Sequence, residues 1–266
     1  EGQTWQRKPR FNTQISQKVD SPPSHELNNL LNKTIEAQII PRLLMQHGLN
    51  RPEADSKKAG VPISSDEVKH FAELLIQHKD ELALLETLDM GKPIGDSLAV
   101  DIPGAARALR WSGEAIDKIY DEVAATPHDE LGLITREPVG VVAAIVPWNF
   151  PMIMTAWKLG PALATGNSVI VKPSEKSPLT ALRMAQLALD AGIPAGVLNV
   201  LPGYGHTVGK ALALHMDVDT LVFTGSTKIA KQLMIYAGES NMKRVWLEAG
   251  GKSPNIVFAD APDLQA

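Results

Sequence analysis

Short apolar runs and longer amphipathic segments alternate along the chain from residue 131 onward. The apolar runs predict strands at 131–136, 140–146, 168–172, 197–201, 220–223, 244–247 and 255–258. The segments between them repeat apolar residues at helical steps, which predicts helices at 152–164, 178–191, 207–215 and 228–237. Strands that alternate with helices through short loops favour a doubly wound parallel sheet with helices on both faces. We therefore expect the α/β fold class.

The part of the chain before the sheet shows helical periodicity alone. An amphipathic stripe begins after a capping Ser64 or Ser65 and ends near Gly91, and it predicts one long helix. A second helix is expected at 94–120, with a bend near Pro103. The sheet is thus expected to follow a helical N-terminal region.

Residues 1–63 follow neither pattern clearly. Apolar steps predict a helix at 25–47 with a kink at Pro41, and 48–62 is rich in Gly, Pro, Lys and Asp, as connecting segments are. We interpret residues 1–63 as an atypical N-terminal segment and linker, and residues 64–266 as one domain.

Composition narrows the classes of function. The 266 residues are 44% hydrophobic and 21% charged, and the net charge of −4 gives no bulk basic surface for nucleic acid or anionic membrane. The longest apolar run, 139–146, is too short to span a bilayer, and residues 1–10 lack the features of a secretory signal. We expect a cytoplasmic protein with no nucleic-acid or membrane partner.

Two further features concern metals and nucleophiles. The sequence contains no cysteine, which removes disulfides, thiolate metal sites and cysteine nucleophiles together. The seven histidines show no His-Glu-x-x-His spacing, and no Gly-x-Ser-x-Gly elbow occurs. We expect no metal site and no α/β-hydrolase chemistry.

Five loops carry the candidate chemistry, and each follows a predicted strand. They are 147–151, 172–175, 203–205, 224–227 and 248–251. The carboxyl ends of parallel strands share one edge of a sheet, so we expect these loops to converge on one ligand.

The loop Lys172-Pro173-Ser174-Glu175 follows the second strand of the alternating series. At this place a dinucleotide-binding sheet presents an acid to the 2′-hydroxyl of the adenosine ribose. Glu175 disfavours a 2′-phosphate, whereas Lys172 and Ser174 tolerate one, so NAD is favoured and NADP is the alternative. A solvated salt-bridging loop is the competing interpretation.

A glycine-containing loop, Gly203-Tyr204-Gly205, also follows a strand. The dinucleotide fingerprint requires glycine at position 208, where the chain has Val208, and Gly209 comes one residue late. The loop is either a cofactor loop or an ordinary tight turn.

The stretch Phe223-Thr224-Gly225-Ser226-Thr227 leads from a strand into a helix. Gly225 allows close approach of the backbone, and the free N–H groups of the helix start can bind a phosphate. The alternative is simple capping of the helix by Ser226 or Thr227.

Asn149 and Glu248 are the candidates for catalysis. Asn149 lies between Trp148 and a Phe-Pro pair, and a rigid amide donor can steady a developing oxyanion. The alternative is a turn asparagine that bonds its own backbone. Glu248 ends an apolar run before Gly250 and Gly251, so it is either part of a strand-end ligand site or a loop acid beside a flexible turn.

Taken in order, these motifs resemble the aldehyde dehydrogenase superfamily over residues 67–266. The matching stretches are Pro147-Trp148-Asn149-Phe150-Pro151, Lys172-Pro173-Ser174-Glu175, Gly203-Tyr204-Gly205, Phe223-Thr224-Gly225-Ser226-Thr227 and Leu247-Glu248-Ala249-Gly250-Gly251-Lys252-Ser253-Pro254. Residues 78–93, 101–123 and 240–264 look most similar to gamma-glutamyl-gamma-aminobutyraldehyde dehydrogenases of putrescine breakdown.

The resemblance implies a Rossmann-like fold and NAD(P)-dependent oxidation of an aminoaldehyde of polyamine catabolism to its carboxylate. A cysteine thiolate of the family attacks the aldehyde, Asn149 would steady the oxyanion, and Glu248 would activate water as a general base. Lys172 and Glu175 would hold the adenosine ribose. The other expected contacts to the dinucleotide are Pro147, Trp148, Ser174, Gly205, Gly209, Phe223, Thr224, Gly225, Ser226, Ala249 and Gly250.

Two departures from the family pattern shape further expectations. Ala230 stands where the family usually has glycine on the cofactor helix. The nucleophilic cysteine, the catalytic domain and the last oligomerisation strand have no counterpart, so we expect a truncated chain that is inactive alone.

The same comparison makes residues 120–137 part of an oligomerisation hairpin. We expect its strand at 131–136 to be unpaired and to favour self-association or aggregation. The alternatives to an enzyme are a non-catalytic dinucleotide-binding or interaction module and a truncated relic.

Overall fold

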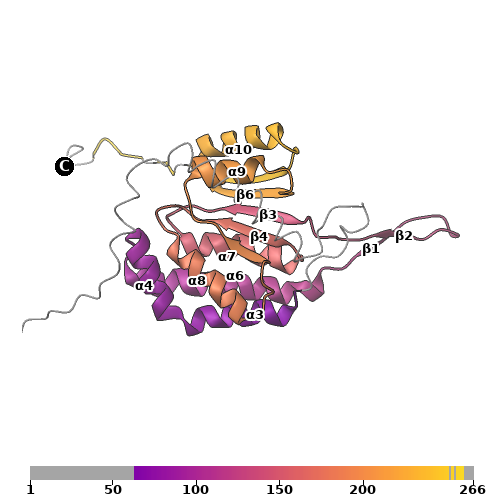
Figure 1. The fold of residues 1–266 in the computed structure, drawn as a ribbon, viewed down its shortest axis with the longest axis horizontal. Coiled ribbons are helices and arrows are strands. Elements are labelled where there is room, and N and C mark those ends of the chain that lie inside the picture. The colour runs from indigo at the N-terminus through magenta and orange to yellow at the C-terminus, as the bar shows by residue number, and fades with distance from the viewer. Residues whose placement is uncertain (1–62, 252, 255, 261–266) are drawn as a thin grey trace, which may run out of the picture.

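The computed structural model describes residues 63–251, 253, 254 and 256–260, so the helix expected at 25–47 lies outside the described residues. Figure 1 shows a sheet between two layers of helices. The helices are α3 Ser65–Gln77, α4 Lys79–Met90, α5 Ile94–Asp96, α6 Ile102–Ala115, α7 Pro151–Ala164, α8 Leu179–Asp190, α9 Lys210–Leu214 and α10 Thr227–Glu239. Shorter turns are the π-helical η4 Ser97–Asp101 and η6 Gly205–Gly209, and the 3-10 turn η5 Ile116–Lys118.

Five parallel strands form the sheet, in the order β5-β4-β3-β6-β7. Their bounds are β3 Val141–Ile145, β4 Ser168–Lys172, β5 Leu198–Val200, β6 Thr220–Gly225 and β7 Arg244–Ala249. The chain enters the sheet at its centre, adds β4 and β5 on one side, and returns to add β6 and β7 on the other. The strand order thus reverses beside β3, and such switch points bind ligands in open α/β sheets. The predicted α/β class with a Rossmann-like parallel sheet is confirmed.

The central strand β3 is buried over its whole length. Val142 and Ala144 pack into the larger core with α3, α6, α7 and α8, whereas Val141 and Ala143 pack with η6 and α9 on the other face. A parallel strand that is covered on both faces needs a continuous apolar run rather than an alternating one. The run at 140–146 therefore becomes the middle of the sheet.

The helical layer begins with a capping box. The Ser64 hydroxyl accepts from the Glu67 N–H at 3.2 Å, and the Glu67 carboxylate accepts from the Ser64 N–H at 2.6 Å.

The expected single helix up to Gly91 is wrong, because the backbone leaves the helical region at His78 (φ −96°, ψ 22°). Arg183 of α8 binds His78 Nδ1 at 3.3 Å, which ties this break to a helix far along the chain.

The helix expected at 94–120, with a bend near Pro103, is divided by the π-helical turn η4, which ends at Asp101, two residues before this proline. A proline ring clashes with the carbonyl group four residues earlier, and that residue, Ala99, lies inside η4. The widened turn relieves the clash, and α6 then continues to Ala115.

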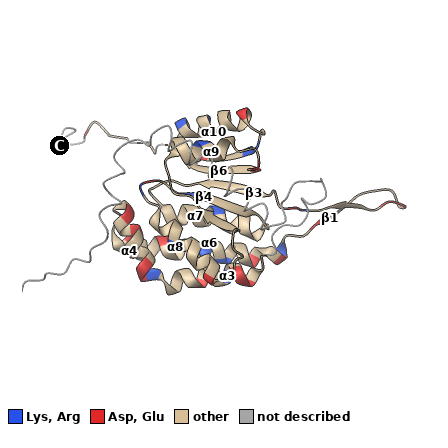
Figure 2. Ribbon diagram, viewed as in Figure 1, with Lys and Arg blue, Asp and Glu red and all other residues tan. Residues whose placement is uncertain are grey.

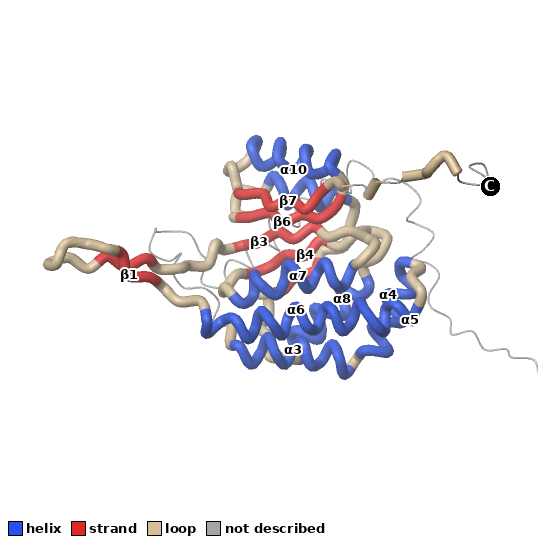
Figure 3. Tube along the Cα trace, turned by 180° about the vertical axis from the view of Figure 1, so that it is seen from behind, coloured by secondary structure: helices blue, strands red, loops and turns tan. Residues whose placement is uncertain are grey.

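Two expected strands need correction. Residues 256–258, expected as a last strand, form no strand, and their side chains are 56–74% exposed. The strand expected to be unpaired, β2 Gly132–Ile134, pairs antiparallel with β1 Glu122–Ala124, because a local hairpin satisfies one of its edges. Figure 3 shows this hairpin extending away from the body of the molecule.

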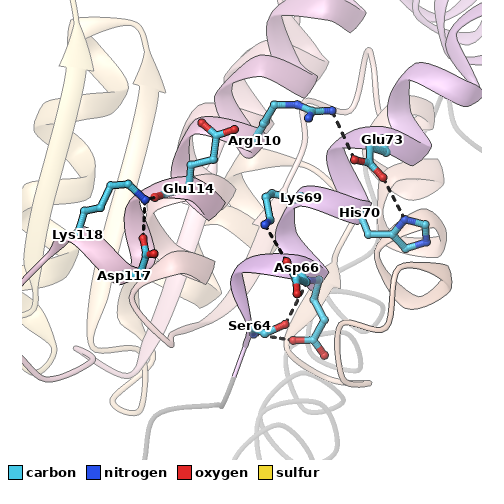
Figure 4. A network of polar contacts seen from close by, with 10 residues as sticks. Ser64, Asp66, Lys69, His70, Glu73, Arg110, Glu114, Asp117 and Lys118 are labelled. Carbon is cyan, nitrogen blue, oxygen red and sulfur yellow. Dashed lines mark hydrogen bonds and ion pairs between the residues drawn. The ribbon is translucent and has the colours of Figure 1, made fainter.

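Figure 2 shows most charged residues on the helices and loops, and the five strands of the sheet contain three, Lys172, Arg244 and Glu248. Figure 4 shows such pairs on α3 and α6, for example Asp66–Lys69 at 2.7 Å and Glu73–Arg110 at 3.7 Å. Exposed pairs of this kind contribute little to stability. Within the described part of the chain, no helix is both long and apolar enough to cross a membrane.

A candidate active site at the carboxyl edge of the sheet

All five expected loops leave the same edge of the sheet, because its five strands are parallel. The Asn149 turn follows the central β3. The loop with Lys172 follows β4 on one side, and the ends of β6 and β7, with Thr224 and Glu248, lie on the other. The topology therefore places the candidate residues around the point where the strand order reverses.

Glu248 lies one residue deeper in β7 than expected. The sequence predicted that β7 ends at Leu247, but the strand continues to Ala249, and Glu248 pairs with Thr224 of β6 in the ladder. Its side chain is exposed. A regular strand fixes the direction of a side chain better than a loop does. Glu248 is therefore a strand residue and not an acid in a flexible loop.

The glycine after this strand is required by its surroundings. Gly250 has φ +91°, a conformation that side chains rarely adopt, and a Cβ there would lie 3.0 Å from Thr227 Oγ1. The turn thus brings the end of β7 against the start of α10.

Lys158 of α7 joins the same group of residues. Its ammonium donates to Thr224 Oγ1 at 2.6 Å. Burial lowers the pKa of Lys158, and the negative charge of Glu248 opposes part of that change. A cation and a carboxylate therefore act on each other beside the end of β6.

The sequence interpretation missed Lys158. The available signal was that Lys158 is the only charged residue in the otherwise apolar segment 151–164. A cation on such a helix is expected to face a polar site.

Lys172 and Glu175 form an ion pair at 3.3 Å at the end of β4. The Lys172 side chain is only 4% exposed, whereas that of Glu175 is 41% exposed. Burial lowers the pKa of Lys172, and the Glu175 carboxylate opposes that change. An ammonium has three donors, so this pair keeps both donors and acceptors for a hydroxyl-bearing ligand. The neighbouring Ser174 accepts from the Lys176 N–H at 3.2 Å and shapes the turn.

The Asn149 turn presents its side chains to solvent. Asn149 is exposed, Trp148 is 51% exposed, and Pro147 is half-buried. The turn is short and leads directly into α7, which begins at Pro151. Proline suits the first turn of a helix and fixes the backbone there.

The start of α10 combines a cap with close packing. Ser226 Oγ accepts from the Ile229 N–H at 3.4 Å, so the capping interpretation describes this serine in the structure. A Cβ on Gly225 would lie 2.5 Å from the Phe223 ring, which explains the glycine by packing. Ala230 is 4% exposed and its methyl group joins the core beneath α10.

The glycines after β5 differ in what they do. Gly203 has φ +156°, and a Cβ there would lie 2.5 Å from Val208 Cγ2, so Gly203 is the residue that the tight turn requires. A Cβ on Gly205 would meet no atom within 4 Å, and one on Gly209 would make an ordinary contact with Ile145 at 3.8 Å. Gly209 thus brings η6 beneath the end of the central strand.

These groups fit the chemistry of a nicotinamide dinucleotide. The 13-residue α10 starts at the switch edge, and a helix N-terminus there favours a pyrophosphate. An amine and a carboxylate side by side after β4 match a ribose diol. No cluster of three or more metal-binding side chains occurs among the described residues.

An apolar cavity of about 590 Å³ lies between α6 and α7. Trp111 and Trp157 line it and are 68% and 59% exposed, and Arg107 and Ile153 also contribute. Ile153 and Trp157 belong to α7, the helix that follows the Asn149 turn.

Comparison with known proteins identifies relatives for most of this chain. The aldehyde dehydrogenase family matches residues 61–266. The NADP/NAD-dependent aldehyde dehydrogenase PuuC of Escherichia coli K12 is 69% identical over 195 residues, which are 73% of this chain and 39% of PuuC.

Solved structures give the same picture. An indole-3-acetaldehyde dehydrogenase crystallised with NAD+ is 85% identical, with a TM-score of 0.71 over 76% of this chain and 41% of that one. The gamma-glutamyl-gamma-aminobutyraldehyde dehydrogenase of Burkholderia cenocepacia is 64% identical, with a TM-score of 0.70 over 75% of this chain and 40% of that one. The 266 residues thus span about two fifths of the length of these relatives.

Proposed function

This chain belongs to the aldehyde dehydrogenase family, and from that premise we propose that it forms the dinucleotide-binding part of an NAD(P)-dependent aldehyde dehydrogenase, which oxidises an aldehyde to its carboxylate. The observation that carries the proposal is the convergence of the Asn149 turn, Lys172 and Glu248 on one edge of a parallel sheet at its switch point. The relative crystallised with NAD+ supports the choice of cofactor.

Each residue has a role in this proposal. Lys172 and Glu175 bind the hydroxyls of the adenosine ribose, and the start of α10 at Ser226 binds the pyrophosphate. The nicotinamide supplies the acceptor for hydride. Asn149 donates its amide N–H to the aldehyde oxygen, and Glu248 takes a proton from water.

We propose that the substrate is an aldehyde with either an amide-containing or an aromatic side chain. The likeness to PuuC and to the gamma-glutamyl-gamma-aminobutyraldehyde dehydrogenase favours the former, within polyamine catabolism. The 85% identity to the indole-3-acetaldehyde dehydrogenase favours the latter, and a cavity with two tryptophans suits a flat aromatic ring. Binding of the two aldehydes to the chain, measured at equal concentrations, distinguishes the two.

We further propose that these 266 residues bind the dinucleotide without oxidising aldehydes on their own. They contain no cysteine, the nucleophile that the family resemblance implies. Cofactor reduction in the presence of either aldehyde, above the rate of a heat-inactivated control, would contradict this.

The experiment that tests the proposed function is a titration of NAD followed by tryptophan fluorescence, to which Trp148 in the Asn149 turn and Trp246 in β7 contribute. Lys172→Met keeps an unbranched side chain of nearly the same length and removes its donors, so NAD is expected to bind about tenfold more weakly, a loss of about 1.4 kcal/mol. Lys176→Met, four residues on and exposed, is the matched control. Absence of NAD binding by the parent chain would reject the proposal.

Three accompanying proposals concern the context of the protein. Exposed apolar side chains on the β1–β2 hairpin, such as Val123 (70%) and Leu133 (63%), support self-association, which sedimentation at several concentrations tests. The family match from residue 61 and the helix that starts at Ser65 support a domain boundary near residue 63. The sequence favours a cytoplasmic location, which cell fractionation tests.

A further inference from the structure

Three ionisable side chains lie buried beneath the Asn149 turn. Glu86 of α4 is 0% exposed and Asp101 of η4 is 1% exposed. Lys92, from the connection between α4 and α5, has a side chain that is 10% exposed, and its ammonium binds Asp101 at 2.6 Å. We call these three residues the buried charge cluster.

The cluster contacts the chain on the far side of the Asn149 turn. The Met152 N–H, in the first turn of α7, donates to Glu86 Oε1 at 3.5 Å. The Lys92 ammonium lies 4.0 Å from the centre of the Phe150 ring, a cation–π contact. Phe150 directly follows Asn149, so the cluster touches the residues on which the direction of the Asn149 amide depends.

The buried charge cluster is electrically neutral only when one of its two carboxyl groups is protonated. Two carboxyl groups face one ammonium group, and Glu86 Oε2, Asp101 Oδ1 and the Thr180 hydroxyl of α8 are buried without a hydrogen-bond partner. Burial, and then the charge of Asp101, raises the pKa of Glu86 to about 7, against the opposing effects of the Lys92 charge and the Met152 N–H. A protonated Glu86 carries one O–H donor, whereas its ionised form carries none.

We propose that Glu86 is a positioning residue for Asn149: its carboxyl group holds the first turn of α7 through the Met152 N–H, while Lys92 holds Phe150 on the other side of Pro151. The importance of this for catalysis rests on the proposed function. The position of the turn itself does not, so the two can be tested separately.

The ionisation of Glu86 changes both of its contacts. The anion accepts more strongly from the Met152 N–H and interacts favourably with the helix start, as negative groups do there. It also loses its O–H donor and is repelled by Asp101. The turn that carries Trp148 and Asn149 therefore takes a slightly different position on each side of neutral pH.

The test measures the turn through Trp148, without any cofactor. The chain is labelled with fluorotryptophan, and the fluorine resonance of Trp148 is assigned by its loss in Trp148→Phe. We expect this resonance to shift with a midpoint near pH 7 in the parent. The midpoint is expected to vanish in Glu86→Gln, which keeps the shape of the side chain. Asp80→Asn, on the exposed side of the same helix, is the control and is expected to leave the titration unchanged.

Two outcomes would overturn the proposal. They are a parent resonance that does not titrate between about pH 5 and pH 9, and a titration that survives in Glu86→Gln. If Glu86→Gln fails to fold, Lys92→Met serves instead: loss of the positive charge is expected to move the Trp148 midpoint to higher pH, and an unmoved midpoint would refute the inference. NAD titration of the parent in the same samples tests the proposed function alone.

Discussion

Replacement of Glu86 by glutamine is expected to change how the stability of the protein depends on pH. Glu86 is fully buried, and its pKa rises from 4.5 to about 7 on folding. Between these two values the folded protein holds a proton that the unfolded chain has released. Stability from this group is therefore fully present below pH 4.5 and is lost as pH rises toward 7.

The magnitude follows from the size of the shift. One pKa unit corresponds to about 1.4 kcal/mol, so a shift from 4.5 to about 7 corresponds to about 3 kcal/mol. Glutamine does not titrate. The free energy of unfolding of the parent, minus that of Glu86→Gln, is thus expected to fall by about 3 kcal/mol between acid and slightly alkaline pH.

The assay is urea unfolding followed by circular dichroism, on both proteins, at several pH values. The difference between the two proteins cancels the groups that they share. Two parallel curves of unfolding free energy against pH would refute the assignment of a buried, proton-binding carboxyl group to Glu86. A difference that rises with pH would mean that folding lowers the pKa of Glu86 instead of raising it.

Three further substitutions test other parts of the structure. Ser64→Ala removes the hydroxyl of the capping box and is expected to cost about 1 kcal/mol in urea unfolding, whereas Ser65→Ala, inside the helix, is expected to cost less; equal losses would contradict the cap. Gly250→Ala is expected to destabilise the protein by about 1 kcal/mol or more, because its φ of +91° disfavours a side chain; an unchanged melting temperature would argue against this turn. Leu159→Ala, at a position that is 0% exposed, is expected to cost about 2–5 kcal/mol, and a loss below about 1 kcal/mol would mean that α7 is not packed as described.

The parallel sheet could be predicted because its signals are local. The strand at 168–172 is found with the expected bounds, since a fully buried strand is a continuous apolar run between turn residues. The break at His78 could not be predicted, because the contact with Arg183 comes from more than a hundred residues away. Residues 256–258 are apolar and have strand propensity, yet a strand also requires a partner, which a local pattern does not reveal.

The candidate site also contains residues that could be predicted from the sequence and residues that could not. Lys172 and Glu175 are close in sequence, and their ion pair could be expected from the loop alone. The contact of Lys158 with Thr224 joins residues that are 66 positions apart, and the contact of Glu86 with Met152 spans the same separation. Such pairs depend on how helices pack across the sheet, so the sequence showed the strand-end residues but not the groups that support them.

The central position of β3 has a consequence for the order in which the chain is synthesised. The buried residues of the larger core all lie between Ile63 and Leu198, so this core can close before the rest of the chain leaves the ribosome. Among the described residues, the other face of β3 and β4 is covered by residues from Leu201 onward. A nascent chain of about two hundred residues therefore displays one finished core and one bare apolar face, and this is the stage at which a chaperone would have a surface to bind.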